Sequence, residues 1–249
     1  MSVRWEYTGG VGRITLDRPE VANALDLPTA RELAEAVTAA EAGDVRVVLL
    51  TGAGARFCAG GDVGSFLAAE EPPEYLHELA SGVEAALRRL SGLPKPVVAG
   101  VRGAVAGAGL AFVLNADVVV AARSTKFRMA YAGIGLTPDC GVSYLLPRAI
   151  GTQRALELAL TGRTLSAEEA REWGLVTEVV DDDALDGRAA ALAGALADGP
   201  AGALGQAKRL IRSSFEVSRA RSAADEAETI AAAVRTSEAQ QLIERFTAR

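Results

Sequence analysis

Short apolar runs and longer amphipathic segments alternate along the first three quarters of the chain. The apolar runs are rich in β-branched residues and are bounded by Gly, Pro or Asp, which is typical of buried strands. They cover residues 11–16, 45–51, 97–101 and 118–122. Segments 28–41 and 73–90 repeat apolar side chains at helical spacing and therefore predict helices. This alternation predicts an α/β fold.

The last quarter of the chain has a different pattern. After about Asp181 the β-type runs end, and helical segments rich in Ala and Leu continue to the C-terminus. A box-like spacing from Ser237 to Gln240 predicts the start of one of these helices. We therefore expect a core of residues 1–190 followed by a helical region of residues 191–249.

Composition removes several classes of function. The 249 residues are 49% hydrophobic and 23% charged, as in an ordinary soluble globular protein. A net charge of -6 without a run of Lys or Arg argues against nucleic-acid partners. The longest uncharged stretch of the glycine-rich middle, residues 103–116, is shorter than the roughly 20 residues that cross a bilayer, so we expect no membrane span.

The N-terminus and the cysteines indicate a cellular compartment. The first ten residues carry charges where a secretory signal needs an apolar run, which favours a cytoplasmic location. Cys58 and Cys140 are then expected to be free thiols. Neither their number nor their spacing predicts a metal site.

Two glycine-rich turns each follow a predicted strand and precede a predicted helix. They are FCAGGDVGSFLAAE (residues 57–70) and PVVAGVRGAVAGAGLAFVLNAD (residues 96–117). The first backbone N–H groups of a helix are unpaired, and Gly and Ala let a ligand approach them closely. If the two turns converge, their N–H groups form a pair of donors suited to a carbonyl oxygen that becomes an enolate.

Two other glycine-rich patterns do not match these turns. A dinucleotide-binding fingerprint needs a third glycine where this chain has Phe112, and a phosphate-binding P-loop needs a Gly-Lys-Ser/Thr ending that the sequence lacks. Small residues that only permit tight helix packing would explain either turn alone. The presence of two such turns after two strands favours a binding site.

One acidic residue stands out in the segment IGLTPDCGVSYLLPR. Asp139 is the single carboxylate between Arg128 and Arg148, and its neighbours are mostly glycine and apolar residues. A carboxylate in this setting is suited to act as a general base. The same residue is also well placed to N-cap a helix predicted at residues 141–150. The residue pattern alone leaves both interpretations open.

Five ordered motifs resemble the enoyl-CoA hydratase/isomerase, or crotonase, superfamily. They are RITLDRPEVANALD, RFCAGGDV, AGVRGAVAGAGLAFVLNADVVVAA, FRMAYAGIGLTPDCGVSYLLPR and EWGLVTEVV, and they extend to about residue 185. The resemblance implies a crotonase-like spiral of ββα units and a C-terminal helical region that assembles a homotrimer or a dimer of trimers. It also implies an acyl-CoA thioester substrate, with CoA as part of the substrate and no separate cofactor.

Roles for individual residues follow from their positions in these motifs. The resemblance implies that Gly61 and Ala108 supply the two oxyanion-hole amides. It further implies substrate or CoA contacts from Ala22, Ala24, Ala59, Gly60, Asp62, Val63, Tyr131 and Phe246, with Arg249 beside Phe246 in the tail. For Asp62, an N-cap of the following helix is the stronger expectation, since Asp before a helical run is a common cap.

The positions of the two glutamates of the family's hydratases hold other residues. By motif position they are Ala111 and Tyr131. Because hydration needs one group to activate water and another to handle the proton at the α-carbon, this change disfavours a hydratase. The GLTPDCG motif resembles the isomerase branch that includes 1,2-epoxyphenylacetyl-CoA isomerases, in which an aspartate at the position of Asp139 is the base. We therefore expect an acyl-CoA isomerase, with a hydratase or related lyase and a non-catalytic acyl-CoA binder as alternatives.

The remaining candidate side chains have weaker arguments. His77, the single histidine, is expected to have a surface or packing role on the helix predicted at 73–90. A serine hydrolase is disfavoured because the chain has no G-x-S-x-G elbow. Cys140 neighbours the expected base, but a buried cysteine usually acts as a small apolar filler. Tyr131 is expected to donate a hydrogen bond or to shape the acyl site, and the sequence does not specify the acyl group.

Overall fold

The computed structural model describes residues 1–248, so Arg249 lies outside the described residues. Its main sheet has the strand order β1-β2-β3-β4-β6-β9. β1 pairs with β2 in antiparallel fashion, and all later pairs are parallel. The bounds are β1 Val3–Thr8, β2 Val11–Leu16, β3 Val47–Gly52, β4 Val97–Val101, β6 Val118–Ala122 and β9 Glu178–Val180. The four predicted strands agree with β2, β3, β4 and β6.

A second, smaller sheet runs beside the main one. It contains β5 (Ala104–Ala106), β7 (Lys126–Arg128) and β8 (Thr164–Ser166), in the order β5-β7-β8. Single parallel bridges, Cys58 with Val105 and Leu25 with Gly61, continue this layer toward earlier parts of the chain. Successive turns of the chain therefore contribute a main-sheet strand, a short segment in the second layer and a helix, which confirms the expected spiral of ββα units.

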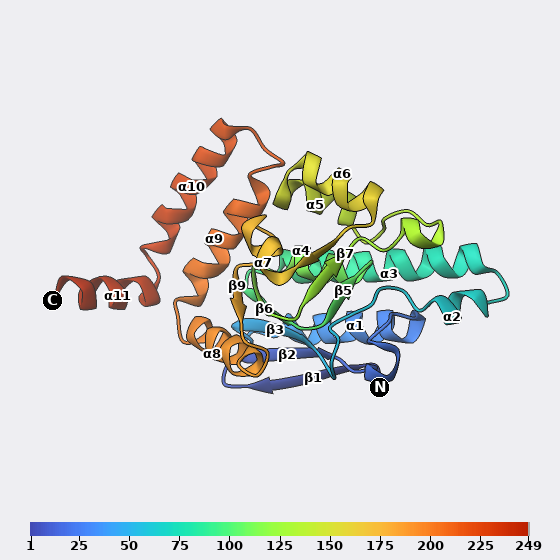
Figure 1. The fold of residues 1–249 in the computed structure, drawn as a ribbon. Helices are drawn as coiled ribbons and strands as arrows, with labels where there is room; N and C mark the ends of the chain where they lie inside the picture. The colour runs from blue at the N-terminus through green and yellow to red at the C-terminus, as the bar shows by residue number, and fades with distance from the viewer. Residues whose placement is uncertain (249) are drawn as a thin grey trace.

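Helices surround the two sheets. α1 and α3 correspond to the predicted helices and lie side by side along the core, as Figure 1 shows. The bounds are α1 Leu27–Ala40, α2 Val63–Leu67, α3 Pro72–Gly92, α4 Gly109–Asn115, α5 Val142–Ile150, α6 Thr152–Thr161, α7 Ala167–Glu172, α8 Leu185–Ala197, α9 Ala201–Ser213, α10 Arg219–Ala233 and α11 Ser237–Thr247. Short 3-10 helices, η1 (Pro19–Val21) and η2 (Ala132–Ile134), lie in the loops.

The side chains of β3 alternate between the two faces of the main sheet, and each face has its own apolar core. Val48 and Leu50 face the main core with α1 and α3, whereas Val47 and Leu49 face the alanines of α8 on the opposite side of the sheet. Successive side chains of a strand point to opposite faces, so a strand that is apolar throughout needs cover on both. The long apolar run at this position therefore indicates a fully buried central strand.

The C-terminal helices begin on this core and then leave it. α8 packs on the sheet, and α9 lies against the loop before β4, where Lys208 pairs with Asp117. α10 and α11 then lead outward to the C-terminus (Figure 1). The expected division at residues 190 and 191 falls within α8 and stays a prediction. A helix does begin at Ser237, as the spacing predicts, but its N-cap is Thr236, whose side chain accepts from the Ala239 amide. Within residues 1–248, no helix combines the length and apolar character that a membrane crossing requires.

Candidate active site

The first glycine-rich turn connects β3 to α2. Leu25 accepts from the Asp62 amide at 2.8 Å and donates to the Gly60 carbonyl at 2.8 Å. In a parallel bridge of this kind, the residue between the two bonded neighbours directs its own N–H and C=O to the opposite side. The Gly61 amide therefore points away from Leu25. A Cβ on Gly61 would meet nothing within 4 Å, so hydrogen bonds and not side-chain packing set its direction.

The second turn connects β5 to α4 and packs directly against the first. Gly107 adopts a φ of 53°, and its amide donates to the Arg128 carbonyl at 3.1 Å. A Cβ on Gly109 would lie 2.4 Å from the Cys58 carbonyl oxygen. Only glycine permits this approach, which brings the start of α4 onto the segment before Gly60.

The two turns converge at the expected pair of amides. A Cβ built on Gly60 would lie 3.5 Å from Gly107 Cα and 3.6 Å from the Ala108 nitrogen. Within residues 1–248, neither the Gly61 nor the Ala108 amide donates to a protein oxygen. Two available N–H groups on adjacent turns are the arrangement that can stabilise a negatively charged oxygen.

Tyr131 connects these turns to Asp139. Its ring lies beside Gly107, where a Cβ would be 4.0 Å from Tyr131 Cζ. Its hydroxyl donates to Asp139 Oδ1 at 2.7 Å. Burial, and after it the negative charge of Asp139, raises the pKa of Tyr131, so the phenol stays protonated and keeps its donor. Tyr131 was expected to donate a hydrogen bond or to shape the acyl site, and the structure shows the hydrogen bond.

Asp139 does not cap the following helix. α5 has Gly141 at its N-cap, with a φ of 75° and no side-chain cap. The Asp139 backbone carbonyl accepts from the Val142 amide at 3.0 Å, while its carboxylate accepts from Tyr131. The capping interpretation is therefore wrong, and the carboxylate is directed toward the glycine-rich turns through Tyr131.

A second carboxylate, that of Glu84, lies near Asp139, and the sequence pattern did not predict it. A Cβ on Gly141 would be 3.0 Å from Glu84 Oε2, which brings this residue of α3 to the loop that carries Asp139. Partial burial raises the pKa of Glu84; Arg88 acts against this rise and Asp139 adds to it. Glu84 and Gly141 also line a cavity of about 850 Å³ between α3, α5 and α9. A glutamate at an ordinary helical position gives no local signal of this placement.

The cysteines are buried and the histidine lies on the surface, in line with the structural roles expected of them. Both Cys58 and Cys140 are free and buried. Burial raises the pKa of Cys58 to about 12 and raises that of Cys140 as well, so neither thiol is reactive near neutral pH. His77 is exposed on α3. Among residues 1–248, no group of three or more His, Cys, Asp or Glu side chains is arranged to hold a metal ion.

The segment with Ala22 and Ala24 lies against the first glycine-rich turn. Ala22 and Asn23 adopt left-handed φ angles of 56° and 55°, and the Ala59 amide donates to the Ala22 carbonyl at 3.0 Å. The Asn23 side chain ties this segment down by donating to the Ala53 and Arg56 carbonyls at 2.9 and 2.7 Å. The backbone expected to contact CoA is therefore held beside Gly60 and Gly61.

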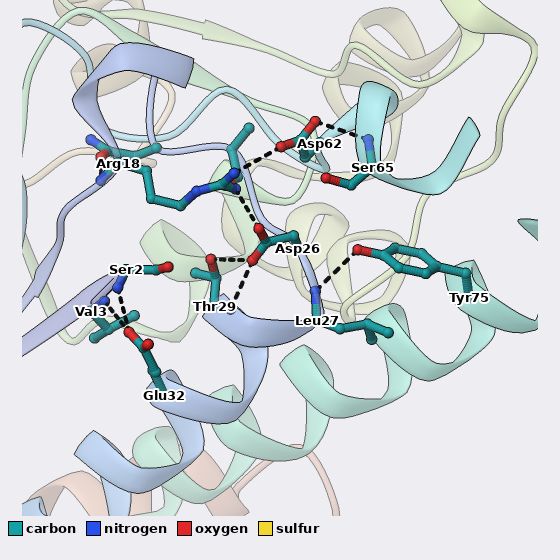
Figure 2. Close-up of polar contacts among 12 residues, drawn as sticks. Ser2, Val3, Arg18, Asp26, Leu27, Thr29, Glu32, Asp62, Ser65 and Tyr75 are labelled. Atoms are coloured by element: carbon teal, nitrogen blue, oxygen red, sulfur yellow. Dashed lines mark hydrogen bonds and ion pairs between the residues drawn. The ribbon is translucent and has the colours of Figure 1, made fainter. Parts of the chain in front are cut away.

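Asp62 caps α2 as expected, and it also belongs to an ion-pair cluster that the sequence did not reveal. Its Oδ1 accepts from the Ser65 amide at 3.2 Å, and its Oδ2 contacts Arg18 at 3.0 Å. Partial burial acts to raise the pKa of Asp62, but the hydrogen bonds from Ser65 and Arg18 outweigh it and keep the pKa below its usual value. Figure 2 shows Arg18 between the carboxylates of Asp62 and Asp26.

Three further residues complete the expected set. Ala111 is fully buried in α4 and packs in the core, where it offers no acid or base. Val63 is exposed at the start of α2. Phe246 is 80% exposed on α11, at the end of the helices that lead outward (Figure 1), and its contact with CoA stays a prediction.

Comparison with known proteins identifies the family. A family model described as enoyl-CoA hydratase/isomerase matches residues 6–249. The chain therefore belongs to the enoyl-CoA hydratase/isomerase family, which agrees with the resemblance expected from its motifs. The family acts on acyl-CoA thioesters.

Curated relatives carry both isomerase and hydratase names. The chain is 46% identical over 209 residues to 1,2-epoxyphenylacetyl-CoA isomerase of Escherichia coli K12, covering 82% of this chain and 79% of that protein. It is 41% identical over 208 residues to a probable enoyl-CoA hydratase of Rhodobacter capsulatus, covering 84% and 80%. These relatives therefore share the family, but their names refer to different reactions.

Solved structures share the fold over nearly the whole chain. A putative enoyl-CoA hydratase/isomerase from Mycobacterium abscessus has a TM-score of 0.95 at 36% identity, covering 99% of this chain and 96% of that one. An enoyl-CoA hydratase from Bacillus anthracis has a TM-score of 0.94 at 31% identity, covering 100% and 96%. The fold is therefore the crotonase fold.

Proposed function

We propose that this protein is an acyl-CoA isomerase that moves a double bond, or isomerises a ring or epoxide, through an enolate. The observation that carries the proposal is the hydrogen bond from Tyr131 to Asp139 beside the two glycine-rich turns. This hydrogen bond orients the Asp139 carboxylate at a site where the amides of Gly61 and Ala108 have no protein acceptor within residues 1–248. A double-bond shift needs one base, because the same group can remove a proton and return it.

The proposed reaction balances with the residues of this site. For a 3-enoyl thioester, the Asp139 carboxylate removes a proton from C2, and the electron pair of that C–H bond forms a double bond between C1 and C2. The thioester oxygen gains the negative charge, and the Gly61 and Ala108 amides stabilise it. Each such donor contributes a factor of about 10²–10³ to the rate. The protonated Asp139 then delivers the proton to C4, and the double bond moves to C2–C3.

The binding of CoA in this proposal depends on backbone atoms of the two segments that flank the first turn. Ala22 and Ala24 on one side, with Ala59, Gly60 and Val63 on the other, would contact the adenine and pantetheine parts. CoA is part of the substrate, and the proton returns to the same molecule, so we expect no separate cofactor.

We also expect the protein to assemble as a homotrimer or a dimer of trimers through its C-terminal helices. Apolar side chains on α9, the segment after it and α10 support this expectation, since Ile211, Phe215 and Ile230 are 69%, 68% and 72% exposed. A monomer rarely leaves a set of large apolar side chains in water. Light scattering coupled to size-exclusion chromatography tests this assembly.

Hydration of a 2-enoyl-CoA is the second candidate, and Glu84 is the observation that favours it. Glu84 and Asp139 together would supply the two acid–base groups that hydration needs. A relative at 41% identity also has the name of a probable hydratase.

A panel of 2-enoyl- and 3-enoyl-CoA esters separates these candidates. In deuterated water, an isomerase moves the double bond and adds no oxygen, and it incorporates deuterium at C2 and C4 to the extent that protonated Asp139 exchanges with solvent before it returns the proton. In heavy-oxygen water, a hydratase incorporates the label at C3. Binding of every ester with neither double-bond movement nor either label would contradict both candidates and indicate an acyl-CoA binder without catalysis.

A further inference from the structure

Arg18 joins two segments of the site through one guanidinium group. It lies just after β2, and its side chain is 18% exposed. Its Nη1 donates to the Ala24 carbonyl at 2.6 Å and contacts Asp26 Oδ2 at 3.1 Å. Its Nη2 donates to Asp62 Oδ2 at 3.0 Å. Figure 2 shows both carboxylates directed at this group.

Each carboxylate also caps a helix, and it uses its other oxygen to do so. Asp26 Oδ1 accepts from the Thr29 amide at 2.8 Å at the start of α1. Asp62 Oδ1 accepts from the Ser65 amide at 3.2 Å at the start of α2. Capping therefore does not require Arg18, and Arg18 adds a connection between the two helix starts.

This connection lies next to the bridge that directs the Gly61 amide. Asp26 follows Leu25 in the chain, and Asp62 follows Gly61, so the ion pairs flank the Leu25–Gly61 bridge. The two backbone hydrogen bonds of this bridge, with a third from the Ala59 amide to the Ala22 carbonyl, still permit small movements of the segments, because each bond tolerates a range of angles. A planar guanidinium that contacts both sides restricts this movement, since its donors have a fixed geometry.

Gly61 depends on this restraint more than a residue with a side chain would. A Cβ at Gly61 would meet no atom within 4 Å, so packing does not fix the peptide before it. A misdirected donor in an oxyanion hole loses much of its effect on the transition state.

We propose that Arg18 is a positioning residue that aims the Gly61 amide at the thioester oxygen by clamping Asp26 and Asp62 on either side of the Leu25–Gly61 bridge. The inference rests on the proposed function, and it assigns a role in that site to a residue outside the motif positions of the oxyanion amides. Arg18 touches no substrate in this account.

The test measures how strongly the site polarises a bound thioester carbonyl. The probe is 4-dimethylaminocinnamoyl-CoA, whose absorbance moves to longer wavelength when hydrogen bonds draw charge onto the carbonyl oxygen. Arg18→Lys keeps the charge but loses the fork that spans both carboxylates. Asp62→Asn keeps a good N-cap for α2 but loses its charge toward Arg18. The exposed Arg31–Glu78 pair, which joins α1 and α3, supplies the matched control Arg31→Lys.

We expect both Arg18→Lys and Asp62→Asn to reduce the wavelength shift and to lower kcat about tenfold or more, with the Kd of the probe within about threefold of wild type. Arg31→Lys should match wild type in all three measurements. If wild type shifts the probe and both variants keep the full shift and kcat, the role of Arg18 is contradicted. If wild type does not shift the bound probe, the proposed oxyanion site itself is contradicted, and the role of Arg18 with it.

Discussion

The hydroxyl of Tyr131 donates to Asp139 Oδ1 at 2.7 Å, so the residue at one position where the family's hydratases have a glutamate binds the single carboxylate of the loop between β7 and α5. The phenol cannot act as the missing acid or base near neutral pH, because burial and the adjacent negative charge raise its pKa. We expect Tyr131 instead to orient Asp139.

Tyr131→Phe keeps the ring and removes this donor. We expect kcat to fall about tenfold, since a hydrogen bond to a charged group contributes about 1.5–3 kcal/mol and part of that energy orients the carboxylate. The measurement is kcat at neutral pH for a 3-enoyl-CoA ester.

Tyr144→Phe is the matched control, because Tyr144 is 49% exposed on α5. Its kcat should equal that of wild type. An unchanged kcat for Tyr131→Phe would contradict the orienting role.

Gly109→Ala should disrupt the contact between the two glycine-rich turns. The new Cβ would lie 2.4 Å from the Cys58 carbonyl oxygen, a backbone atom that cannot rotate away. We expect the free energy of unfolding, measured by urea denaturation, to fall by about 1–3 kcal/mol. We expect kcat to fall by more than the loss of folded protein explains, because the start of α4 moves relative to Gly61.

Gly194→Ala provides the comparison for that variant. Gly194 lies inside α8, and a Cβ there would meet nothing within 4 Å. Alanine in an open helical position should stabilise the fold by about 0.5–1 kcal/mol. Equal stability of the two variants would contradict the close approach at Gly109.

Glu169 should make stability depend on acid pH. It forms a capping box with Ser166 at the start of α7 and pairs with Arg163. The hydrogen bonds from the Ser166 amide and hydroxyl, followed by that from Arg163, lower the pKa of Glu169 from 4.5 to about 2. A carboxyl whose folded pKa is depressed stabilises the protein above its unfolded pKa, and this contribution is lost as the pH falls from 4.5 toward 2.

Glu169→Gln keeps the acceptor of the capping box but cannot titrate. We expect its free energy of unfolding to change less than that of wild type between about pH 5 and about pH 3, measured by urea denaturation at each pH. Glu172→Gln, an exposed position on the same helix, is the control and should follow wild type. Identical pH dependence in all three proteins would contradict the assignment to Glu169.

The main elements were predictable because their residue patterns are local. β4 and β6 agree with the apolar runs at 97–101 and 118–122 to the residue, since buried parallel strands are apolar on both faces. β5, β7 and β8 are three residues each, too short to establish a period, and they were missed. β1 was missed as well, because Arg4, Glu6 and Tyr7 interrupt it with polar or exposed side chains.

The site was predictable in its backbone and not in its supporting contacts. The glycine-rich turns predicted where two backbone amides could meet, whereas the family resemblance assigned the amides to Gly61 and Ala108 and the base to Asp139. Arg18 and Asp62 are 44 positions apart in the sequence, so no local spacing signals their ion pair. Glu84 approaches Asp139 only because α3 crosses the loop that carries it. Such contacts depend on tertiary packing, which residue periodicity does not encode.

Proton exchange in Asp139→Asn tests the central claim most directly. Wild type and variant would be incubated with a 3-enoyl-CoA ester in deuterated water, and deuterium at C2 and C4 would be followed by nuclear magnetic resonance alongside the Kd of the ester. We expect wild type to exchange and isomerise, and the variant to lose both by about 10²–10⁴ while its Kd stays within a few fold. Exchange and turnover at the wild-type rate in Asp139→Asn would contradict the account.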